Sequence, residues 1–263
     1  MKQDVTVLIP SFNPGSYLAQ AIESVFQQTY QSWKVVIVDD GSNDNSLFTI
    51  KHYLMDPRVI LIKMKKNYGQ SKAQNAGLKM INTPYTLKLD ADDWLFPNSL
   101  EVLLQEVQNV SNKVALICGN KTDVYCDENG NKLIEVPRRE GITFENPYQF
   151  LLSNFVPFPR LYRTKVLKEL GGWPTDDPWQ GRHMEDRRMD FLIVEKYEIK
   201  WIDKMLYNYR QHPNNATKNI ELYNQVFEWL IYYTLKKWGD EYEPQFKTHC
   251  GWRQLSELRL KKS

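Results

Sequence analysis

Short apolar runs alternate with helical patterns over the first 90 residues, and this alternation is what most constrains the fold. The apolar runs predict four strands, at Val5–Ile9, Val35–Val38, Val59–Ile62 and Tyr85–Leu89. Apolar residues at helical spacing predict helices between them, over about residues 18–25, 46–54 and 71–81. Uninterrupted apolar strands separated by helices are typical of parallel strands that are buried on both faces. The order therefore predicts an α/β fold with a doubly wound, mostly parallel sheet.

The second half of the chain is less regular. Asn129-Gly130 lies between segments that can pair, which predicts a β-hairpin over residues 125–136. A helix is predicted over Glu185–Lys196, and short strands at Ile199–Ile202 and Met205–Tyr209. Apolar residues between 222 and 234 recur at helical spacing. We therefore expect one domain over residues 1–218 and a helical extension, 219–263, packed on it.

Composition limits the partners and the compartment. The 263 residues include 34 Lys and Arg against 32 Asp and Glu, so no basic excess suggests a nucleic-acid partner. No apolar run approaches the roughly 20 residues that cross a bilayer. The first apolar stretch ends at Pro10 and is predicted to be a strand rather than a secretory signal. Three cysteines without a pairing pattern favour a reducing compartment, so we expect a cytoplasmic protein, with peripheral contact at the inner face of the membrane left open.

Polar clusters follow three of the predicted strands: Pro10-Ser-Phe-Asn13, Asp39-Asp-Gly-Ser42 and Asp90-Ala-Asp-Asp93. Ligands of doubly wound sheets bind at the carboxyl ends of the strands, so these clusters are expected to share one edge. Five acidic residues meeting there would repel one another unless some bind a cation or the donors of a ligand.

Each acidic cluster has a chemical and a structural interpretation. Asp90-x-Asp92 offers the oxygen ligands that Mg²⁺ or Mn²⁺ prefers, whereas Asp93 could simply cap a helix that begins near Pro97. Asp39 and Asp40 suit a ribose or a base, or a tight turn. A dehydrogenase-type dinucleotide site is excluded, because the first strand is not followed by Gly-x-Gly-x-x-Gly.

Taken in order, the motifs resemble those of family 2 glycosyltransferases with the GT-A fold, the SpsA-like bacterial enzymes. The motifs that match, between about residues 4 and 218, are Pro10-Ser-Phe-Asn13, Glu23-Ser24-Val25, Gln28-Thr29, Val38-Asp-Asp-Gly-Ser42, Asn67-x-Gly69, Asn75-x-Gly77, Asp90-Ala-Asp-Asp93, Gly171-Gly-Trp173, Glu185-Asp186 and Tyr209-Arg-x-His212. One position departs from the family, which often has Arg where this chain has Gln74, and Lys72 is a candidate for the missing charge.

The resemblance implies a nucleotide-binding N-terminal half, an acceptor-binding C-terminal half and a role for individual residues. Those implied to bind the donor are Pro10, Ser11, Asn13, Asp39, Asp40, Lys72, Asp90 and Arg210, with Asp40 preferred over Asp39 for the base. Those implied to hold Mn²⁺ or Mg²⁺ are Asp92, Asp90 and His212. Asp186 is implied to be the general base, with Glu185 as the alternative.

The implied reaction is an inverting, metal-dependent transfer of one sugar from a nucleotide-diphosphate sugar, expected to be a UDP-sugar, to an acceptor hydroxyl. Surface polysaccharide or glycoconjugate synthesis is the expected setting. A saccharide, a lipid-linked saccharide, a peptide or a small molecule stays open as acceptor, as does a homodimer. A nucleotidyltransferase and a sugar-nucleotide-binding protein without transfer activity are the alternatives.

Two further expectations concern the acceptor side and a loop. Four aromatic residues there could stack on sugar rings or belong to the core: Phe155, Phe158, Trp173 and Trp179. The segment around Pro213-Asn-Asn215, followed by Ala216 and Thr217, has no apolar anchors and is expected to close as a lid over the donor.

Overall fold

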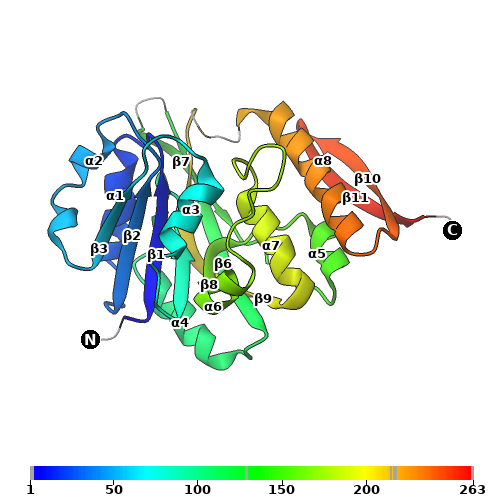
Figure 1. Cartoon of the computed structure of the whole chain (residues 1–263), viewed down its shortest axis with the longest axis horizontal. Helices are drawn as coiled ribbons and strands as arrows, with labels where there is room; N and C mark the ends of the chain where they lie inside the picture. The colour runs from blue at the N-terminus through cyan, green and yellow to red at the C-terminus, as the bar shows by residue number, and fades with distance from the viewer. Residues whose placement is uncertain (1–2, 128–129, 142, 214, 216–217, 262–263) are drawn as a thin grey trace.

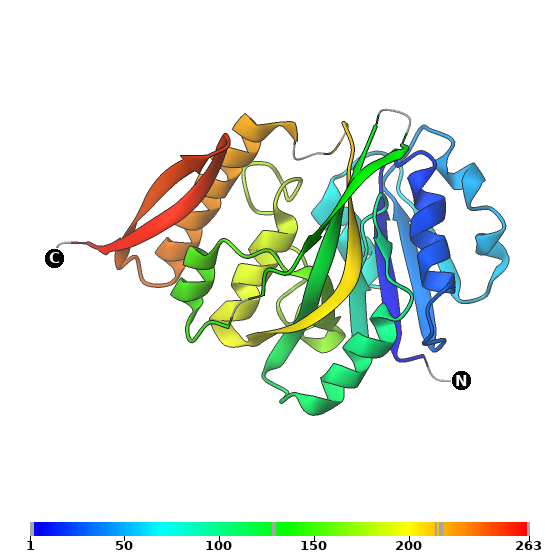
Figure 2. The same ribbon diagram turned by 180° about the vertical axis from the view of Figure 1, so that it is seen from behind.

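A curled sheet organises the chain, with helices on both of its faces (Figures 1 and 2). The computed structural model describes residues 3–127, 130–141, 143–213, 215 and 218–261, and within these ranges nine strands form the main sheet. The elements in chain order are β1 (Val5–Ser11), α1 (Tyr17–Phe26), β2 (Trp33–Asp39), α2 (Ser46–Thr49), η1 (Tyr53–Met55), β3 (Val59–Lys63), α3 (Gln70–Leu78), β4 (Tyr85–Lys88), β5 (Trp94–Leu95), α4 (Ser99–Asn109), β6 (Val114–Cys126), β7 (Lys132–Arg138), α5 (Pro147–Ser153), β8 (Phe158–Arg163), α6 (Thr164–Glu169), α7 (Glu185–Lys196), β9 (Glu198–Gln211), α8 (Ile220–Lys237), β10 (Tyr242–His249) and β11 (Trp252–Leu260).

The predicted doubly wound, mostly parallel sheet is confirmed. Its strand order is β3-β2-β1-β4-β8-β6-β9-β5, and the first four strands are parallel. Strand β8 runs antiparallel to β4 and β6, while β6 and β9 are parallel to each other. The sheet thus continues past the predicted strands into the second half of the chain.

Alternation along β1 explains how both faces of the sheet are covered. Val5, Val7 and Ile9 pack in one core cluster with residues of α1 and α4. Leu8 points to the opposite face and packs in a second cluster with residues of α3 and α7. Successive strand residues point to opposite faces, so an all-apolar strand needs a helix layer on each side.

The C-terminal segment lies at the end of the molecule opposite α2 (Figure 1). Helix α8 forms where the periodicity predicts it, and it packs through Phe227 and Leu230 against Phe150 of α5 and Phe191 of α7. The expected all-helical extension is wrong in its second half, where β10 and β11 form an antiparallel hairpin. Only a few side chains of this hairpin, Tyr242, Phe246, Leu255 and Leu258, pack in the core cluster with α8, so a weakly apolar sequence suffices for it.

Other local predictions differ in detail. The helix expected over 46–54 is reduced to the short α2 and η1, and the two short strands expected between 199 and 209 are one strand, β9. The predicted pairing on either side of Asn129-Gly130 is present as β6 with β7, although residue 129 lies outside the described residues. Within the described part of the chain, no helix combines the length and apolar character that crossing a membrane requires.

Helix α3 approaches the sheet closely because Gly77 faces it. A Cβ atom at this position would lie 2.3 Å from Cδ1 of Leu8 and 2.9 Å from Cγ2 of Val38. We expect Gly77→Ala to lower the free energy of unfolding by about 1–3 kcal/mol, since the added methyl overpacks the interface. Urea denaturation checks this, with Ala76→Ser as the control on the same helix, expected within about 0.5 kcal/mol of wild type. A stabilised Gly77→Ala protein would show that α3 can move away from the sheet without cost.

Candidate active site

The three polar clusters do share one edge of the sheet. Ser11 and Asp39 are partners in the β1–β2 register, and Asp40 donates its N–H to the carbonyl of Ser11. The first loop is fastened to the second by Asn13, whose N–H donates to Oγ of Ser42 at 2.9 Å. Asn13 Oδ1 in turn accepts from the N–H of Asn43 at 2.9 Å. Pro10 to Asn13 and the Asp-Gly-Ser turn are therefore one connected surface.

Asp40 and Asp39 differ in what they hold. Both carboxylate oxygens of Asp40 accept backbone N–H groups, from Tyr68 at 2.8 Å and from Gly69 at 2.7 Å. Burial still raises the pKa of Asp40, although these two hydrogen bonds oppose the shift. Asp39 accepts one backbone N–H, from Ser42 at 3.0 Å. The geometry thus gives Asp40 the task of holding the Asn67-x-Gly69 loop, which leaves Asp39 the better candidate for a ligand.

The carboxylates that follow β4 also accept hydrogen bonds from protein groups. Asp93 is 1% exposed and accepts from the hydroxyl of Tyr207 at 2.8 Å and from the N–H of Arg210 at 2.7 Å. The suggested helix cap is wrong, because Asn98 is the N-cap residue of α4. Burial, then the charges of Asp92 and Asp90, raise the pKa of Asp93 well above its ordinary value. Asp93 therefore shapes the loop that presents Asp90 and Asp92.

Asp92 and His212 form the open corner of the site. His212 Nε2 lies 3.1 Å from Oδ2 of Asp92, and the Asp92 side chain is 32% exposed. A carboxylate oxygen and an imidazole nitrogen side by side suit Mn²⁺, with a ligand's phosphates completing the shell. Among the described residues, no group of three or more His, Cys, Asp or Glu side chains is arranged to hold a metal ion. The donor set therefore fits a cation shared with a ligand rather than one enclosed by protein.

Arg210 contacts the backbone of Asp92 and so helps to fix this corner. Its Nε donates to the carbonyl of Asp92 at 2.8 Å, and its guanidinium carbon lies 4.3 Å and 4.6 Å from the ring centroids of Tyr17 and Trp94. Arg210 is 4% exposed. The guanidinium is therefore engaged by protein groups, and the predicted contact of Arg210 with the donor stays a prediction.

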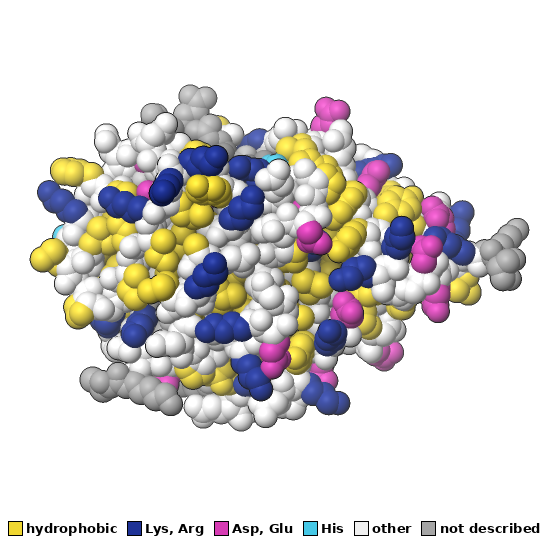
Figure 3. Space-filling model, in the orientation of Figure 1, with side chains coloured by type: hydrophobic (Ala, Val, Ile, Leu, Met, Phe, Trp, Pro, Cys, Tyr) yellow, Lys and Arg dark blue, Asp and Glu magenta, His cyan; other side chains and the backbone are white. Residues whose placement is uncertain are grey.

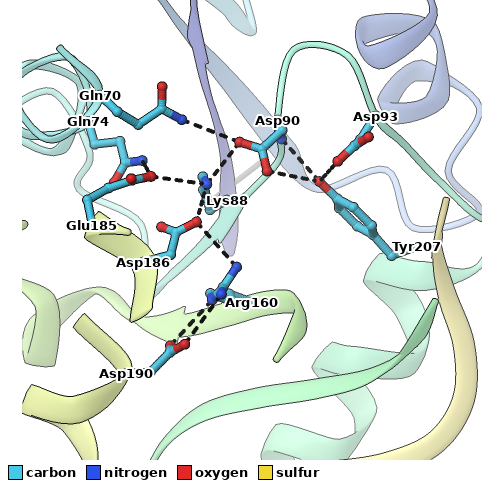
Figure 4. Close-up of polar contacts among 10 residues, drawn as sticks. All are labelled: Gln70, Gln74, Lys88, Asp90, Asp93, Arg160, Glu185, Asp186, Asp190 and Tyr207. Atoms are coloured by element: carbon cyan, nitrogen blue, oxygen red, sulfur yellow. Dashed lines mark hydrogen bonds and ion pairs between the residues drawn. The ribbon is translucent and has the colours of Figure 1, made fainter. Parts of the chain in front are cut away.

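A buried lysine that the sequence analysis missed joins the two predicted ends of the site (Figure 4). Lys88 Nζ lies 2.9 Å from Oδ1 of Asp90 and 3.6 Å from Oε1 of Glu185, and it also pairs with Oδ2 of Asp186. Burial alone would lower the pKa of Lys88, but the three carboxylates raise it above its ordinary value. One ammonium group thus balances carboxylates that lie almost 100 residues apart in the sequence.

Arg160 extends the network on the same face of the sheet. It is the partner of Lys88 in the β4–β8 register, and two like charges directly opposite would destabilise the pair. Asp186 relieves this, because its Oδ2 also accepts from Nη1 of Arg160 at 3.3 Å. Asp190, one turn further along α7, accepts from Nε and Nη2 of Arg160 at 3.3 Å each.

The pKa values of the two carboxylates at the start of α7, Glu185 and Asp186, are shifted in opposite directions. Burial raises the pKa of Asp186, but the charges of Lys88 and Arg160 outweigh it and the pKa is lowered. Burial and then the charge of Asp186 raise the pKa of Glu185 to about 7. Oε1 of Glu185 accepts from the neutral amide of Gln74 at 3.1 Å. The departure at position 74 thus leaves Glu185 without the charge that an Arg there would supply.

Two residues of the matched motifs, Asn75 and Trp173, hold the framework of the fold, while Lys72, Ser11 and Pro10 stay predicted donor contacts. Asn75 makes two hydrogen bonds to the backbone of Trp173, at 2.7 Å and 2.8 Å, which fastens α3 to the Gly-Gly-Trp turn. Trp173 is 1% exposed and belongs to the core, as the structural interpretation held. Lys72 Nζ donates to Oε1 of Gln180 at 3.2 Å, at the rim of the site. Ser11 is buried beside Asp39, and Pro10 precedes it in β1.

The remaining predictions concern the aromatic residues on the acceptor side and the expected lid. Phe158 packs against Tyr207 and Tyr209, and Trp179 packs against Trp229 of α8. Residues 214, 216 and 217 of the expected lid lie outside the described residues. The signal that could have revealed Lys88 is a lone cation in the mostly apolar strand Tyr85–Leu89. Phe158–Arg163 gives no such signal for Arg160, because it contains a second arginine, Arg163.

The sequence profile described as "Glycosyl transferase family 2" matches residues 6–171. Glycosyltransferase GlyG of Streptococcus pneumoniae is 33% identical over 234 residues, which are 83% of this chain and 74% of that protein. Chondroitin synthase of Escherichia coli is 34% identical over 128 residues, 48% of this chain and 18% of that protein.

Solved structures show the same fold. S. aureus TarS 1-349 in complex with UDP superposes with a TM-score of 0.63 at 18% identity, over 88% of this chain and 66% of that chain. Mannosyltransferase PcManGT from Pyrobaculum calidifontis, in complex with GDP-Man and Mn²⁺, has a TM-score of 0.59 at 15% identity, over 90% and 64%. This chain thus spans about two thirds of the length of these two neighbours.

The raised pKa of Glu185 predicts how stability depends on pH. The folded protein holds this proton more tightly than the unfolded chain, so the free energy of unfolding contributed by Glu185 falls as pH rises from about 4.5 to about 7. Glu185→Gln removes that fall. Relative to wild type, the variant should be more stable at pH 8 than at pH 5 by about 1 kcal/mol or more.

Urea denaturation at the two pH values measures the difference. Glu195→Gln, at an exposed position on the same helix, is the control and should show no such difference between the two pH values. A Glu185→Gln protein that is no more stable relative to wild type at pH 8 than at pH 5 would contradict the raised pKa.

Proposed function

The chain belongs to glycosyl transferase family 2, and we propose that it transfers one sugar from a nucleotide-diphosphate sugar to an acceptor hydroxyl with inversion at the anomeric carbon. Family membership makes the protein a glycosyltransferase, and its fold is of the GT-A type, as the motifs predicted. The donor, the metal, the mechanism and the roles of single residues are our proposal.

The observation that carries the proposal is the bridge through Lys88. Asp90 opens the loop that carries Asp92, and Asp92 in turn contacts His212. Asp186 lies in the first turn of α7, and Lys88 contacts both Asp90 and Asp186. A transferase that inverts the anomeric carbon must hold a leaving group and a proton acceptor on opposite sides of that carbon. The bridge brings groups suited to these two tasks into one site.

The donor is proposed to lie along the edge formed by the first two loops. Asp39 would accept hydrogen bonds from the base, since both oxygens of Asp40 already hold backbone groups. Pro10, Ser11 and Asn13 would line the nucleoside. A UDP-sugar is our first choice, supported by the UDP and UDP-GlcNAc complexes of TarS. The GDP-Man complex of PcManGT makes GDP-sugars the second.

The diphosphate is proposed to face Asp92 and His212. A divalent cation held there would stabilise the negative charge that grows on the leaving diphosphate, and the Mn²⁺ complex of PcManGT supports this choice. Arg210, pinned between Tyr17 and Trp94, would keep the Asp92 backbone in place. Asp90 is turned toward Lys88, which makes the ribose or a water its more suitable partner than the metal.

Asp186 is our proposed general base. The acceptor oxygen bonds to the anomeric carbon, the bond from that carbon to the diphosphate oxygen breaks, and the acceptor proton passes to the carboxylate. Lys88 and Arg160 keep Asp186 ionised at neutral pH and therefore able to take the proton. Glu185 is the alternative, since a pKa of about 7 also suits a base.

The saccharide class of the acceptor is supported by the relatives alone. Chondroitin synthase is named for a polysaccharide, and synthesis of a surface polysaccharide or glycoconjugate would fit this chain. Peripheral membrane contact, a homodimer and a division at residue 218 remain parts of the proposal. A nucleotidyltransferase is disfavoured, because the chain belongs to a family of transferases that move sugars.

The role of Asp92 is open to a direct test. We expect Asp92→Asn to weaken UDP binding in Mn²⁺ by about 10-fold to 100-fold, because one of two protein ligands is lost. Titration calorimetry with and without Mn²⁺ measures this. Asp203→Asn, at a 56% exposed side chain elsewhere on β9, is the control and should bind like wild type. Equal affinity of the wild type with and without Mn²⁺ would contradict a metal site.

The assignment of the base is tested by turnover and by its pH dependence. Asp186→Asn should keep donor affinity and lose roughly 10²-fold or more of turnover. Asp190→Asn is the matched control, since it removes a carboxylate from Arg160 on the same helix and should cost stability more than turnover.

The wild-type pH profile separates Asp186 from Glu185. With Asp186 as base, kcat/KM stays level as pH falls from 8 to 5, because the pKa of Asp186 is lowered. A rate that halves near pH 7 would instead assign the base to Glu185.

A further inference from the structure

Helix α8 brings an aromatic side chain to the acidic end of the site. The ring centroids of Tyr223 and His183 are 5.8 Å apart in an edge-to-face arrangement, and His183 is two residues before Glu185. Burial raises the pKa of Tyr223, and the charges of Glu185, Asp90 and Asp186 add to the shift against that of Lys88. The Tyr223 side chain is therefore close enough to interact electrostatically with the carboxylates that Lys88 bridges.

The Tyr223 ring is backed by the C-terminal hairpin. Trp252 of β11 lies with its ring centroid 6.3 Å from that of Tyr223, again edge to face. The hairpin turn is fixed to α8 by Asn224, which donates to the carbonyl of Gly251 at 2.8 Å and accepts from the N–H of Arg253 at 2.8 Å. The His183, Tyr223 and Trp252 side chains thus form one supported wall, which we call the aromatic wall.

The aromatic wall has groups that the protein does not satisfy. Within the described residues, the Tyr223 hydroxyl makes no hydrogen bond, and Nδ1 of His183 is buried without a partner. Tyr223 itself is only partly buried. Figure 3 shows hydrophobic side chains gathered along α8 on the visible face of the molecule. A half-buried tyrosine ring whose hydroxyl no described residue engages is better suited to a ligand that has polar groups than to a purely apolar one.

We propose that the C-terminal extension completes the acceptor site, with Tyr223 stacking on a saccharide acceptor whose hydroxyl faces Glu185 and Asp186. This inference rests on the proposed function, since it places the acceptor next to the proposed base. A saccharide is the occupant we favour because it offers an apolar ring face for Tyr223 and a hydroxyl for the phenol. The matching family profile ends at residue 171, so the wall lies outside the part of the chain that the profile describes.

Binding of neutral oligosaccharides tests the inference without a known acceptor. Maltotriose, triacetylchitotriose and lactose are each mixed with the full chain, UDP and Mn²⁺, and saturation-transfer NMR measures contact and affinity. We expect at least one to bind the wild type. Tyr223→Ala should weaken that sugar about tenfold, the weight of one aromatic contact, and Tyr223→Phe should weaken it less. UDP affinity should be unchanged in every variant.

Matched variants separate stacking from folding. Tyr232→Ala removes a 47% exposed tyrosine from the same helix and should bind sugar like wild type. Tyr223→Leu keeps apolar volume without the ring and should lose the sugar while its thermal unfolding stays close to wild type.

The outcomes distinguish the inference from the function on which it rests. UDP binding without a signal from any of the three sugars, or sugar affinity unchanged in Tyr223→Ala, overturns the inference and leaves the proposed function standing. Loss of sugar in Tyr232→Ala to the same extent also overturns it. Failure of UDP and UDP-sugars to bind the wild type would instead contradict the proposed donor.

Discussion

The rest of the site depends on one buried ammonium group. Lys88 is 4% exposed and contacts carboxylates from the loop after β4 and from the start of α7. A carboxylate buried without a partner is costly, so loss of the lysine would oppose the packing of α7 against the sheet at this point. Arg160 repeats the arrangement one strand further along, with Asp186 and Asp190 as its partners. The electrostatic network thus fixes the position of α7, and with it the spacing between the two ends of the site.

The acidic edge of the sheet is neutralised mostly by the protein itself. Asp40 holds two backbone N–H groups, Asp93 holds a backbone N–H and the Tyr207 hydroxyl, and Asp90 pairs with Lys88. The repulsion that seemed to demand a cation is therefore largely relieved before any ligand binds. Asp92 remains the exposed member, with His212 beside it. This leaves Asp92 and His212 as the corner where we propose that a cation and a diphosphate bind.

Glycines and amides set the loops around this edge. Gly69 has a φ of +100° and donates its N–H to Asp40, a backbone conformation that side chains disfavour. Asn75 clamps the Gly-Gly-Trp turn, where a Cβ at Gly172 would lie 2.3 Å from Oδ1 of Asn75. Some of the motifs shared with the family thus hold the loops of this edge, and we propose that others present groups to a ligand. Gln74 departs from these motifs: its neutral amide donates to Glu185, which leaves Lys88 as the nearby cation of that carboxylate.

The sequence by itself determined the parts of this protein that rest on local pattern. Apolar runs and helical periodicity located β1 to β4, α1, α3, α7 and α8, because burial of one or two faces imposes a period on the residues themselves. Polar residues directly after the apolar runs located the edge of the proposed site, because the carboxyl ends of parallel strands meet at one edge of the sheet. Strand β8 and the C-terminal hairpin were not predicted, because their residues are mixed in polarity and the sequence pattern alone does not specify how they pair. The pairing of Lys88 with Asp186, 98 positions away, was decided only by the tertiary structure. No local pattern specifies which carboxylates will share a buried cation, because that choice depends on how the helix and the sheet meet in space.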